Sequence, residues 1–181
     1  MTVAAMPALQ IHAFSRAHDL PAMAGLMAAS DPWLTLGRSA ESCLAVLKDD
    51  SKERYAAFQG DAFAGFLILN LRGAFVGYLQ TVFVAPQVRG GGVGTALVQF
   101  AEERIFSAHP NVFLCVSAFN AGARRLYARL GYAPVGELTD FLAAGQSELL
   151  LRKTRGPIGS YLAGQDCRSP QPPNAAIVAP S

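Results

Sequence analysis

The sequence contains little that would support a metal site or a disulfide framework. Its three cysteines, Cys43, Cys115 and Cys167, lie far apart, and no two of them have the spacing of zinc ligands. An odd, scattered set also differs from the even-numbered frameworks of secreted domains, which favours a reducing cytoplasm. The three histidines occur without the H-x-x-x-H or H-E-x-x-H spacing of zinc enzymes. We therefore expect a cytoplasmic protein without a metal cofactor.

Long hydrophobic runs and an excess of one charge are also missing. No stretch approaches the roughly 18 uninterrupted apolar residues of a membrane-spanning helix, and the first residues lack the basic segment and apolar run of a signal peptide. Fifteen Lys and Arg against thirteen Asp and Glu give a formal charge of +2, too little to attract nucleic acid or an anionic membrane. We therefore expect no nucleic acid and no membrane as partners.

Apolar residues are present in the number that one domain needs. The chain has 181 residues, and 51% of them are hydrophobic, which suits a single buried core. Periodicity and turn residues predict the order strand 10–14, helix 15–29, a helix from Ser39, strands 54–59, 63–71 and 74–84, helix 93–108, strand 111–116, helix 120–130, and strands 133–141 and 146–153. The three strands within 54–84 follow one another closely and are expected to pair antiparallel.

Two further expectations concern the surface and the end of the domain. In helix 93–108, the apolar residues recur every three or four positions, so Glu102, Glu103 and Arg104 are expected to face water. From Thr154 onward the composition shifts to Gly, Pro, Ser and Gln, which cannot easily form a core. We therefore expect a domain at 1–153 and a disordered or loosely packed tail at 154–181.

A glycine-rich loop, Arg89-Gly90-Gly91-Gly92-Val93-Gly94, joins a predicted strand to the start of a predicted helix. Unpaired N–H groups and the dipole at a helix N-terminus favour an anion, and glycines let the backbone approach phosphate oxygens closely. Arg89 adds a charge-assisted hydrogen-bond donor. The loop lacks the Gly-Lys-Ser/Thr of a P-loop and the G-x-G-x-x-G of a dinucleotide site. The pattern favours a pyrophosphate site over the alternative of a flexible turn.

These features resemble the GNAT superfamily of acyl-CoA N-acyltransferases. The run from Val82 to Gly94 looks like the family's acyl-CoA signature, an Arg or Gln, two residues, Gly, any residue, and Gly or Ala, here Arg89, Gly92 and Gly94. The segment 120–132 resembles a second family pattern, Asn, two residues, Ala, three residues, Tyr, three residues, Gly and an aromatic. The resemblance implies an α/β fold with a mixed, mostly antiparallel central sheet of about seven strands, flanked by about four helices.

The resemblance also implies roles for individual residues, with acetyl-CoA as co-substrate and its pyrophosphate on the glycine loop. A backbone N–H group on the strand around 82–84, which includes Phe83 and Val84, would stabilise the oxyanion. Asn120 would hydrogen-bond the pantetheine arm, Arg124 could add to the phosphate side, and the hydroxyl of Tyr127 would face the thioester sulfur. From the residues alone, Tyr127 also fits an ordinary core aromatic at helical spacing.

The group that accepts the proton of the attacking amine is not apparent in the sequence. An amine with a pKa near 10 needs such a group, or an ordered water, at pH 7. Many relatives place a glutamate on the strand before the glycine loop, where this chain has Gln80, which cannot act as a base but could orient a water or bind the acceptor. Asp31, Glu137 and Asp140 are further carboxylates, and no spacing selects one. We expect Cys115, on an apolar strand, to be a small core residue.

The sequence therefore predicts an N-acetyltransferase that moves the acetyl group of acetyl-CoA directly to a primary amine of a small molecule or peptide. Gln80 keeps a catalytically silent acyl-CoA-binding or regulatory module open as an alternative. Acetylation of a protein N-terminus is a second alternative, because segment 120–132 also resembles ribosomal-protein acetyltransferases. Trp33 could form an apolar wall for the acceptor, and Arg38 could pair with a carboxylate. A homodimer is compatible with the sequence.

Overall fold

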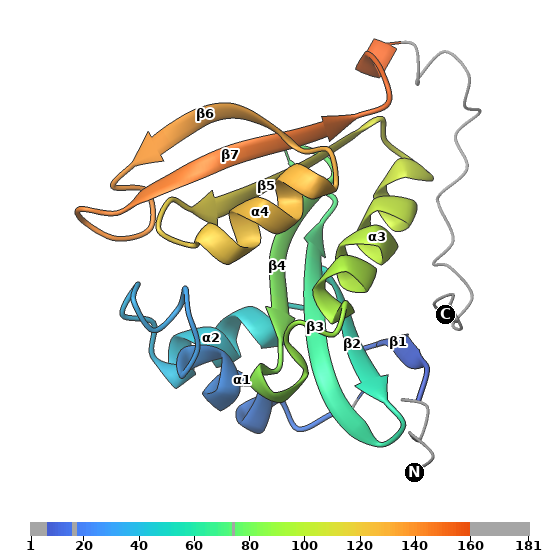
Figure 1. Ribbon diagram of the computed structural model, residues 1–181, viewed down its shortest axis with the longest axis vertical. Coiled ribbons are helices and arrows are strands. Elements are labelled where there is room, and N and C mark those ends of the chain that lie inside the picture. The colour runs from blue at the N-terminus through green and yellow to red at the C-terminus, as the bar shows by residue number, and fades with distance from the viewer. Residues whose placement is uncertain (1–6, 16–17, 74, 160–181) are drawn as a thin grey trace.

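The computed structural model describes residues 7–15, 18–73 and 75–159 (Figure 1). In chain order its elements are β1 (Leu9–Ala13), α1 (Leu20–Ala28), α2 (Ala40–Lys48), β2 (Glu53–Gln59), β3 (Ala62–Asn70), β4 (Tyr78–Val84), the 3₁₀ turn η1 (Pro86–Val88), α3 (Val93–Phe106), β5 (Asn111–Ser117), α4 (Ala121–Arg129), β6 (Ala133–Thr139) and β7 (Ser147–Thr154). The predicted order of strands and helices is confirmed.

The strands form one seven-stranded sheet in the order β1-β2-β3-β4-β5-β7-β6. Every neighbouring pair runs antiparallel except β4 and β5, which are parallel. A parallel pair needs a crossover connection, and α3 supplies it here. The expected mixed, mostly antiparallel sheet is therefore confirmed.

Two hydrophobic cores lie on opposite faces of this sheet. One contains apolar side chains of α3 and α4 together with Leu67 and Leu69 of β3. The other contains side chains of α1 and α2 together with Phe66 and Ile68 of the same strand. Because successive strand residues point to opposite faces, β3 contributes to both cores. The domain has three layers, with α1 and α2 lying together and apart from α3 and α4 (Figure 1).

Local sequence determines where the helices begin. Asp19, Ser39 and Asn120 each accept a hydrogen bond on the side chain from the backbone N–H three residues later, at 3.0–3.1 Å. These are N-caps, which satisfy N–H groups that the helix leaves unpaired. Helix α3 differs, because its N-cap is Gly92, with a φ of 84° and no side-chain hydrogen bond. The first turn of α3 therefore keeps its N–H groups available to a ligand.

Several boundaries differ from the predicted ones. Helix α1 begins at Leu20 rather than near Ser15, because Asp19 caps it. Strand β4 begins at Tyr78 rather than at residue 74, which lies outside the described residues. Strand β7 continues to Thr154, so the first residue assigned to the tail belongs to the sheet. Residues 160–181 lie outside the described part of the chain, and the tail assignment stays a prediction.

The expected water-facing side of α3 is wrong at two of three positions. Glu103 is exposed, but Glu102 is buried and Arg104 is only 4% exposed. Lys153 Nζ donates to Glu102 Oε2 at 2.6 Å, and Arg104 Nε donates to Glu53 Oε2 at 2.8 Å. Partners on β7 and β2 thus hold both charges, because a buried charge is tolerated when it is paired.

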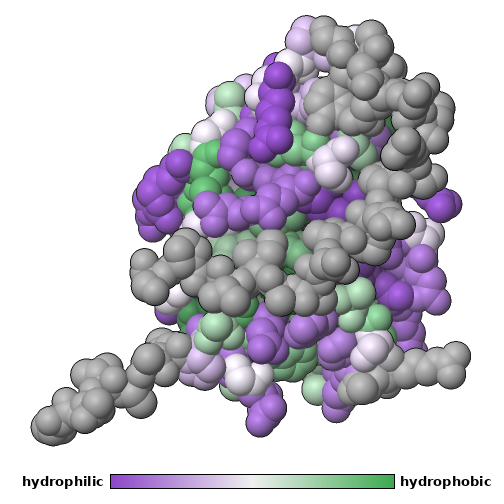
Figure 2. Space-filling model, turned by 90° about the vertical axis from the view of Figure 1, so that its right-hand side faces the viewer, coloured by the Kyte–Doolittle hydropathy of each residue, from purple (hydrophilic) through white to green (hydrophobic). Residues whose placement is uncertain are grey.

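The part of the described surface that Figure 2 shows is mostly hydrophilic. On the face shown in Figure 2, hydrophilic side chains cover much of the coloured surface, and hydrophobic side chains appear in separate patches. Within the described ranges, no helix is long and apolar enough to cross a membrane.

Candidate active site

The central sheet opens between β4 and β5 (Figure 1). Among the described residues, the two strands pair in register at Tyr78 and Phe113, where Phe113 N donates to Gly77 O at 3.0 Å. Gly77 permits this close junction, because it has a φ of 86° and a Cβ there would lie 2.4 Å from Asn111 O. Beyond the junction the strands diverge, so the β5-facing edge of β4 lacks a strand partner within the described chain.

Backbone N–H groups of β4 point into this opening. Ladder hydrogen bonds alternate in direction along a strand, and Ala85 N donates to Ala64 O on the β3 side at 2.9 Å. The N–H groups of Val82 and Val84 therefore point the other way, toward β5. On that same side, Arg89 Nε donates to Val84 O at 3.2 Å, which places the guanidinium beside the opening.

The glycine loop presents further N–H groups beside the opening. Gly90 and Gly92 have φ values of 80° and 84°, in a region that residues with a Cβ rarely adopt. Ala96 N donates to Gly92 O at 3.0 Å, so the N–H groups of residues 93–95 have no partner within the helix. These N–H groups, the helix dipole and the nearby Arg89 fit a pyrophosphate group.

A first cavity, of about 520 Å³, extends along the loop, β4 and α4, and we call it the loop cavity. The predicted binding residues that line it are Phe83, Val84, Arg89, Gly90, Gly92, Gly94, Asn120 and Tyr127. Gly91 and Val93 belong to the loop and are not among its lining residues. Arg124 lines neither this cavity nor the next one, because its Nη1 donates to Ala118 O at 3.0 Å, whereas Arg129 of the same helix lines the loop cavity.

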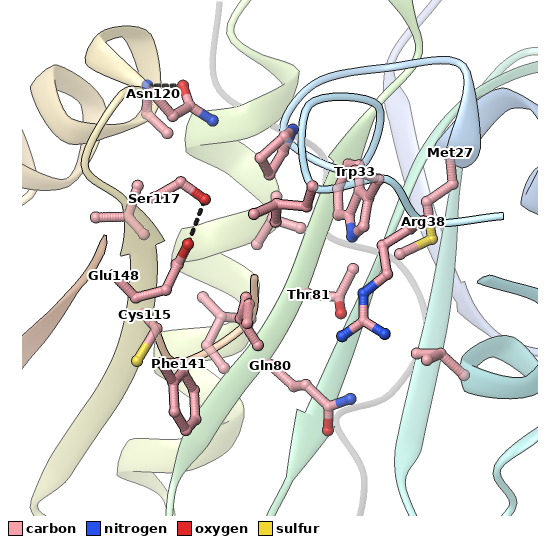
Figure 3. Close-up of a pocket in the computed structure, with 18 of the residues that line it drawn as sticks. Met27, Trp33, Arg38, Gln80, Thr81, Cys115, Ser117, Asn120, Phe141 and Glu148 are labelled. Carbon is pink, nitrogen blue, oxygen red and sulfur yellow. Dashed lines mark hydrogen bonds between the residues drawn. The ribbon is translucent and has the colours of Figure 1, made fainter. Parts of the chain in front are cut away.

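A second cavity, of about 220 Å³, lies next to the first, and we call it the sheet cavity (Figure 3). Its walls come from α1, the α1–α2 loop, α2, β4, β5, α4, β7 and the turn before β7. Six residues line both cavities, namely Pro32, Trp33, Val82, Asn120, Ala123 and Tyr127. The two cavities therefore meet where β4 and β5 separate.

Tyr127 lies at this meeting point. Its side chain is buried, and its ring packs edge-on against Tyr132 with 5.6 Å between the centroids. Burial raises the pKa of the Tyr127 hydroxyl to about 12, so the group stays protonated near neutral pH. Among the described residues we find no hydrogen-bond partner for this hydroxyl, which leaves it free to donate to a ligand in either cavity.

Asn120 also lines both cavities, and its position follows from its role as a helix cap. Its Oδ1 accepts the hydrogen bond from Ala123 N at 3.1 Å, which orients the side-chain amide at the start of α4. The NH₂ group of the same amide remains a donor. The geometry therefore suits the predicted contact with a carbonyl-bearing arm, which stays a prediction.

Gln80 is the extra residue of a β-bulge in β4. The pairing with β3 shifts from Ile68 opposite Thr81 to Leu69 opposite Leu79, so Gln80 has no partner in the register. Bulges re-aim side chains and are common beside active sites. Gln80 lines the sheet cavity, and its acceptor-binding role stays a prediction.

Glu148 is a candidate site residue that sequence reasoning missed. It lines the sheet cavity, is 2% exposed, and accepts a hydrogen bond from Ser117 Oγ at 2.5 Å (Figure 3). Burial raises the pKa of its carboxyl group above the usual value, although the Ser117 hydrogen bond opposes this effect. One sequence signal was available, because Glu148 is the lone carboxylate of its strand and is followed by three leucines. In the sheet it pairs in register with Ser117 of β5.

The sequence matches the acetyltransferase (GNAT) family over residues 17–132. The chain belongs to the GNAT family. The sequence matches none of the curated proteins.

Solved structures with this fold include acetyltransferases with different acceptors. The GNAT chain superposes on an aminoglycoside 6'-N-acetyltransferase complexed with coenzyme A, with a TM-score of 0.66 and 18% identity over 81% of this chain and 97% of the other. It superposes on the ribosomal-protein-S18-alanine N-acetyltransferase of Escherichia coli with a TM-score of 0.65 and 17% identity over 82% and 95%. Nourseothricin acetyltransferase gives 0.53 and 26% identity over 60% and 68%.

None of the other carboxylates considered for this GNAT site lines the sheet cavity. Asp31 lines the loop cavity, where its Oδ1 accepts from Thr35 Oγ1 at 2.6 Å. Glu137 and Asp140 are exposed and line neither cavity. Cys115 was expected in the core but is half-buried and lines the sheet cavity. Across the described residues, no group of three or more His, Cys, Asp and Glu side chains could hold a metal ion.

Proposed function

We propose that this GNAT chain is an acetyl-CoA-dependent N-acetyltransferase that moves the acetyl group directly to an amine. The opening between β4 and β5 carries the proposal. It offers backbone N–H groups at Val82 and Val84 that lack a strand partner among the described residues, and the Tyr127 hydroxyl lies where the loop cavity meets the sheet cavity. Two cavities that join at a hydrogen-bond donor suit a transfer between two bound molecules.

Different residues of the chain would have different roles in the reaction. The glycine loop and Arg89 would bind the pyrophosphate, and the Asn120 amide would orient the pantetheine arm. Val82 N–H and Val84 N–H would donate to the thioester carbonyl, whose oxygen gains negative charge during attack. The Tyr127 hydroxyl would donate a hydrogen bond to the sulfur as it leaves. The amine would enter through the sheet cavity.

The fold family supports this activity in general terms. One structural relative holds coenzyme A, and the relatives are named for an aminoglycoside and for a ribosomal-protein alanine. Their identities to this chain, 18% and 17%, are too low to transfer an acceptor. Acceptor identity therefore has to come from the sheet cavity itself.

Two measurements test the proposed function. Isothermal titration calorimetry should detect binding of acetyl-CoA, and a thiol-release assay should detect free CoA when an amine is added. The amine panel should include amino acids, simple amines, an aminoglycoside and a peptide with a free N-terminus. Acetyl-CoA binding without amine-dependent release would favour a silent binding module, and absence of binding would refute the proposal.

A further inference from the structure

The sheet cavity has two charged side chains among its lining residues, and they have opposite signs. Glu148 comes from β7 and Arg38 from the α1–α2 loop, and the other lining residues are uncharged. Figure 3 shows the two on opposite sides of the view, with β4 between them and the Arg38 guanidinium directed toward Gln80 and Thr81. They form no salt bridge with each other. A ligand in this cavity would therefore meet a negative wall and a positive wall.

Glu148 is incompletely paired for a buried carboxylate. Its side chain is 2% exposed and accepts one hydrogen bond, from Ser117 Oγ to Oε1, within the described part of the chain. A buried carboxylate is costly unless it is paired and hydrogen-bonded. A cation in the cavity would provide the missing partner at Oε2. The amine of an acceptor is such a cation near neutral pH.

Arg38 is the charged residue on the other side of the cavity, at an exposed position. Its backbone N–H donates to Trp33 O at 2.9 Å, which fixes the residue at the end of the loop that forms this wall. Its guanidinium makes no salt bridge or hydrogen bond with the residues that the structure describes. A guanidinium binds a carboxylate through two parallel hydrogen bonds when one is available.

The size of the cavity limits the acceptor. Its volume of about 220 Å³ lies below the roughly 300–1,000 Å³ of pockets that enclose drug-sized ligands. The wall also includes the apolar side chains of Trp33, Phe141 and Leu142. This combination suits a molecule of about amino-acid size with an apolar part.

We propose that the acceptor is a small zwitterion, an amine that also carries a carboxylate, with Glu148 receiving the amine and its proton and Arg38 binding the carboxylate. The inference rests on the proposed function. The acceptor enters as an ammonium ion and releases one proton to solvent. The neutral amine then forms the C–N bond to the acetyl carbon while a second N–H proton passes to the Glu148 carboxylate. The C–S bond breaks, its electron pair stays on sulfur, and the sulfur accepts a hydrogen bond from Tyr127.

Matched acceptors and an arginine variant test the carboxylate contact. Leucine, leucinamide and 3-methylbutylamine share an apolar group, but leucine alone carries a carboxylate. For each acceptor, we compare kcat/KM of the wild type with that of Arg38→Ala, because this ratio cancels the different intrinsic reactivity of the amines. We expect a ratio of roughly 10–100 for leucine, mainly through KM, and near 1 for the other two. Arg125→Ala, at an exposed position that lines neither cavity, is the control.

The pH profile of Glu148→Gln tests the proton-accepting contact. Gln can still accept from Ser117, so the fold should survive, and kcat should fall by roughly 10²- to 10⁴-fold. The titratable neighbours Tyr78 and Cys115 both have a raised pKa and stay protonated near neutral pH. The acceptor ammonium contributes an acid limb in every variant, so the wild-type kcat/KM profile should show a further ionisation at lower pH that is absent in Glu148→Gln and present in the control Glu137→Gln.

Binding measurements make the outcome decisive. With CoA present, leucine should raise the melting temperature of the wild type more than leucinamide does, and Arg38→Ala should abolish the difference. Equal ratios for all three acceptors would overturn the zwitterion assignment. So would an enzyme that binds acetyl-CoA but neither binds nor acetylates amino acids across a panel with different side chains. Failure to bind acetyl-CoA would instead refute the underlying function.

Discussion

Tyr127→Phe isolates the hydroxyl at the meeting point of the two cavities. The substitution keeps the ring that packs against Tyr132 at 5.6 Å and removes a hydroxyl without a partner among the described residues. Because no protein hydrogen bond is lost, the free energy of unfolding should change by less than about 1 kcal/mol. Acetyl-CoA affinity should also be nearly unchanged, since the proposed pyrophosphate site is formed by the glycine loop.

The size of the catalytic effect follows from the environment of the hydroxyl. Burial raises its pKa to about 12, whereas a thiol such as that of CoA has a pKa of about 8.5. Complete proton transfer from Tyr127 to the leaving sulfur is therefore unfavourable, and the hydroxyl acts chiefly as a hydrogen-bond donor to developing charge. Removal of one such donor costs about 10²–10³ in kcat, or about 2.7–4 kcal/mol in activation free energy. We expect this range for Tyr127→Phe.

The assay is kcat between pH 6 and 10, with acetyl-CoA affinity measured by calorimetry. With a pKa of about 12, the Tyr127 hydroxyl stays protonated across this range, so the ratio of wild-type to variant kcat should be independent of pH. Wild-type turnover in the variant would show that Tyr127 serves only as a core aromatic. A ratio that falls toward one as the pH approaches 10 would show that the hydroxyl ionises there and would refute the reasoning from burial.

Three further predictions concern the loop, the buried carboxylate and the sheet junction. Gly94→Asp should weaken acetyl-CoA binding by at least roughly 100-fold in calorimetry and retain its melting temperature, because a carboxylate favours the first helical turn but repels pyrophosphate; Gly94→Ala should bind far better. At pH 8, Glu148→Gln should have a higher melting temperature than the wild type, and this difference should shrink toward pH 4.5. The reason is that the pKa of Glu148 is raised in the folded protein, so the wild type loses stability as Glu148 ionises. A difference that grows in acid would contradict this. Gly77→Ala should cost about 2–4 kcal/mol in urea unfolding, because strain adds to the clash with Asn111 O; Gly73→Ala, with a φ of 93° and open space, should cost about 1–2 kcal/mol.

Features that depend on neighbouring residues in the chain could be predicted from sequence. Ser39 is the N-cap of α2 because its hydroxyl accepts a hydrogen bond from the N–H group three residues later, a separation that can be read from the sequence. The position of the glycine loop before α3 could likewise be predicted, since strand, loop and helix follow one another in the sequence. Family resemblance then implied a mixed, mostly antiparallel sheet of about seven strands, which periodicity alone does not define.

Features that depend on pairing across the sheet could not be predicted. The burial of Glu102 and Arg104 requires partners 51 residues away in the sequence, so helical periodicity assigned both to the surface. Glu148 is a candidate site residue only because Ser117 on another strand donates a hydrogen bond to it and because β4 and β5 diverge. The bulge at Gln80 is likewise a property of the β3–β4 register.

The divergence of β4 and β5 has a consequence for folding. Strands β1 to β4 occupy residues 9–84 and pair consecutively, and β5, β6 and β7 occupy residues 111–154 and pair among themselves. Each half-sheet can form from contacts that are local in sequence, whereas the junction between them requires contacts across α3. The opening between β4 and β5 exists only after the two halves have docked. Acetyl-CoA would therefore bind the assembled domain but neither half alone, and its binding would make the halves unfold as one unit.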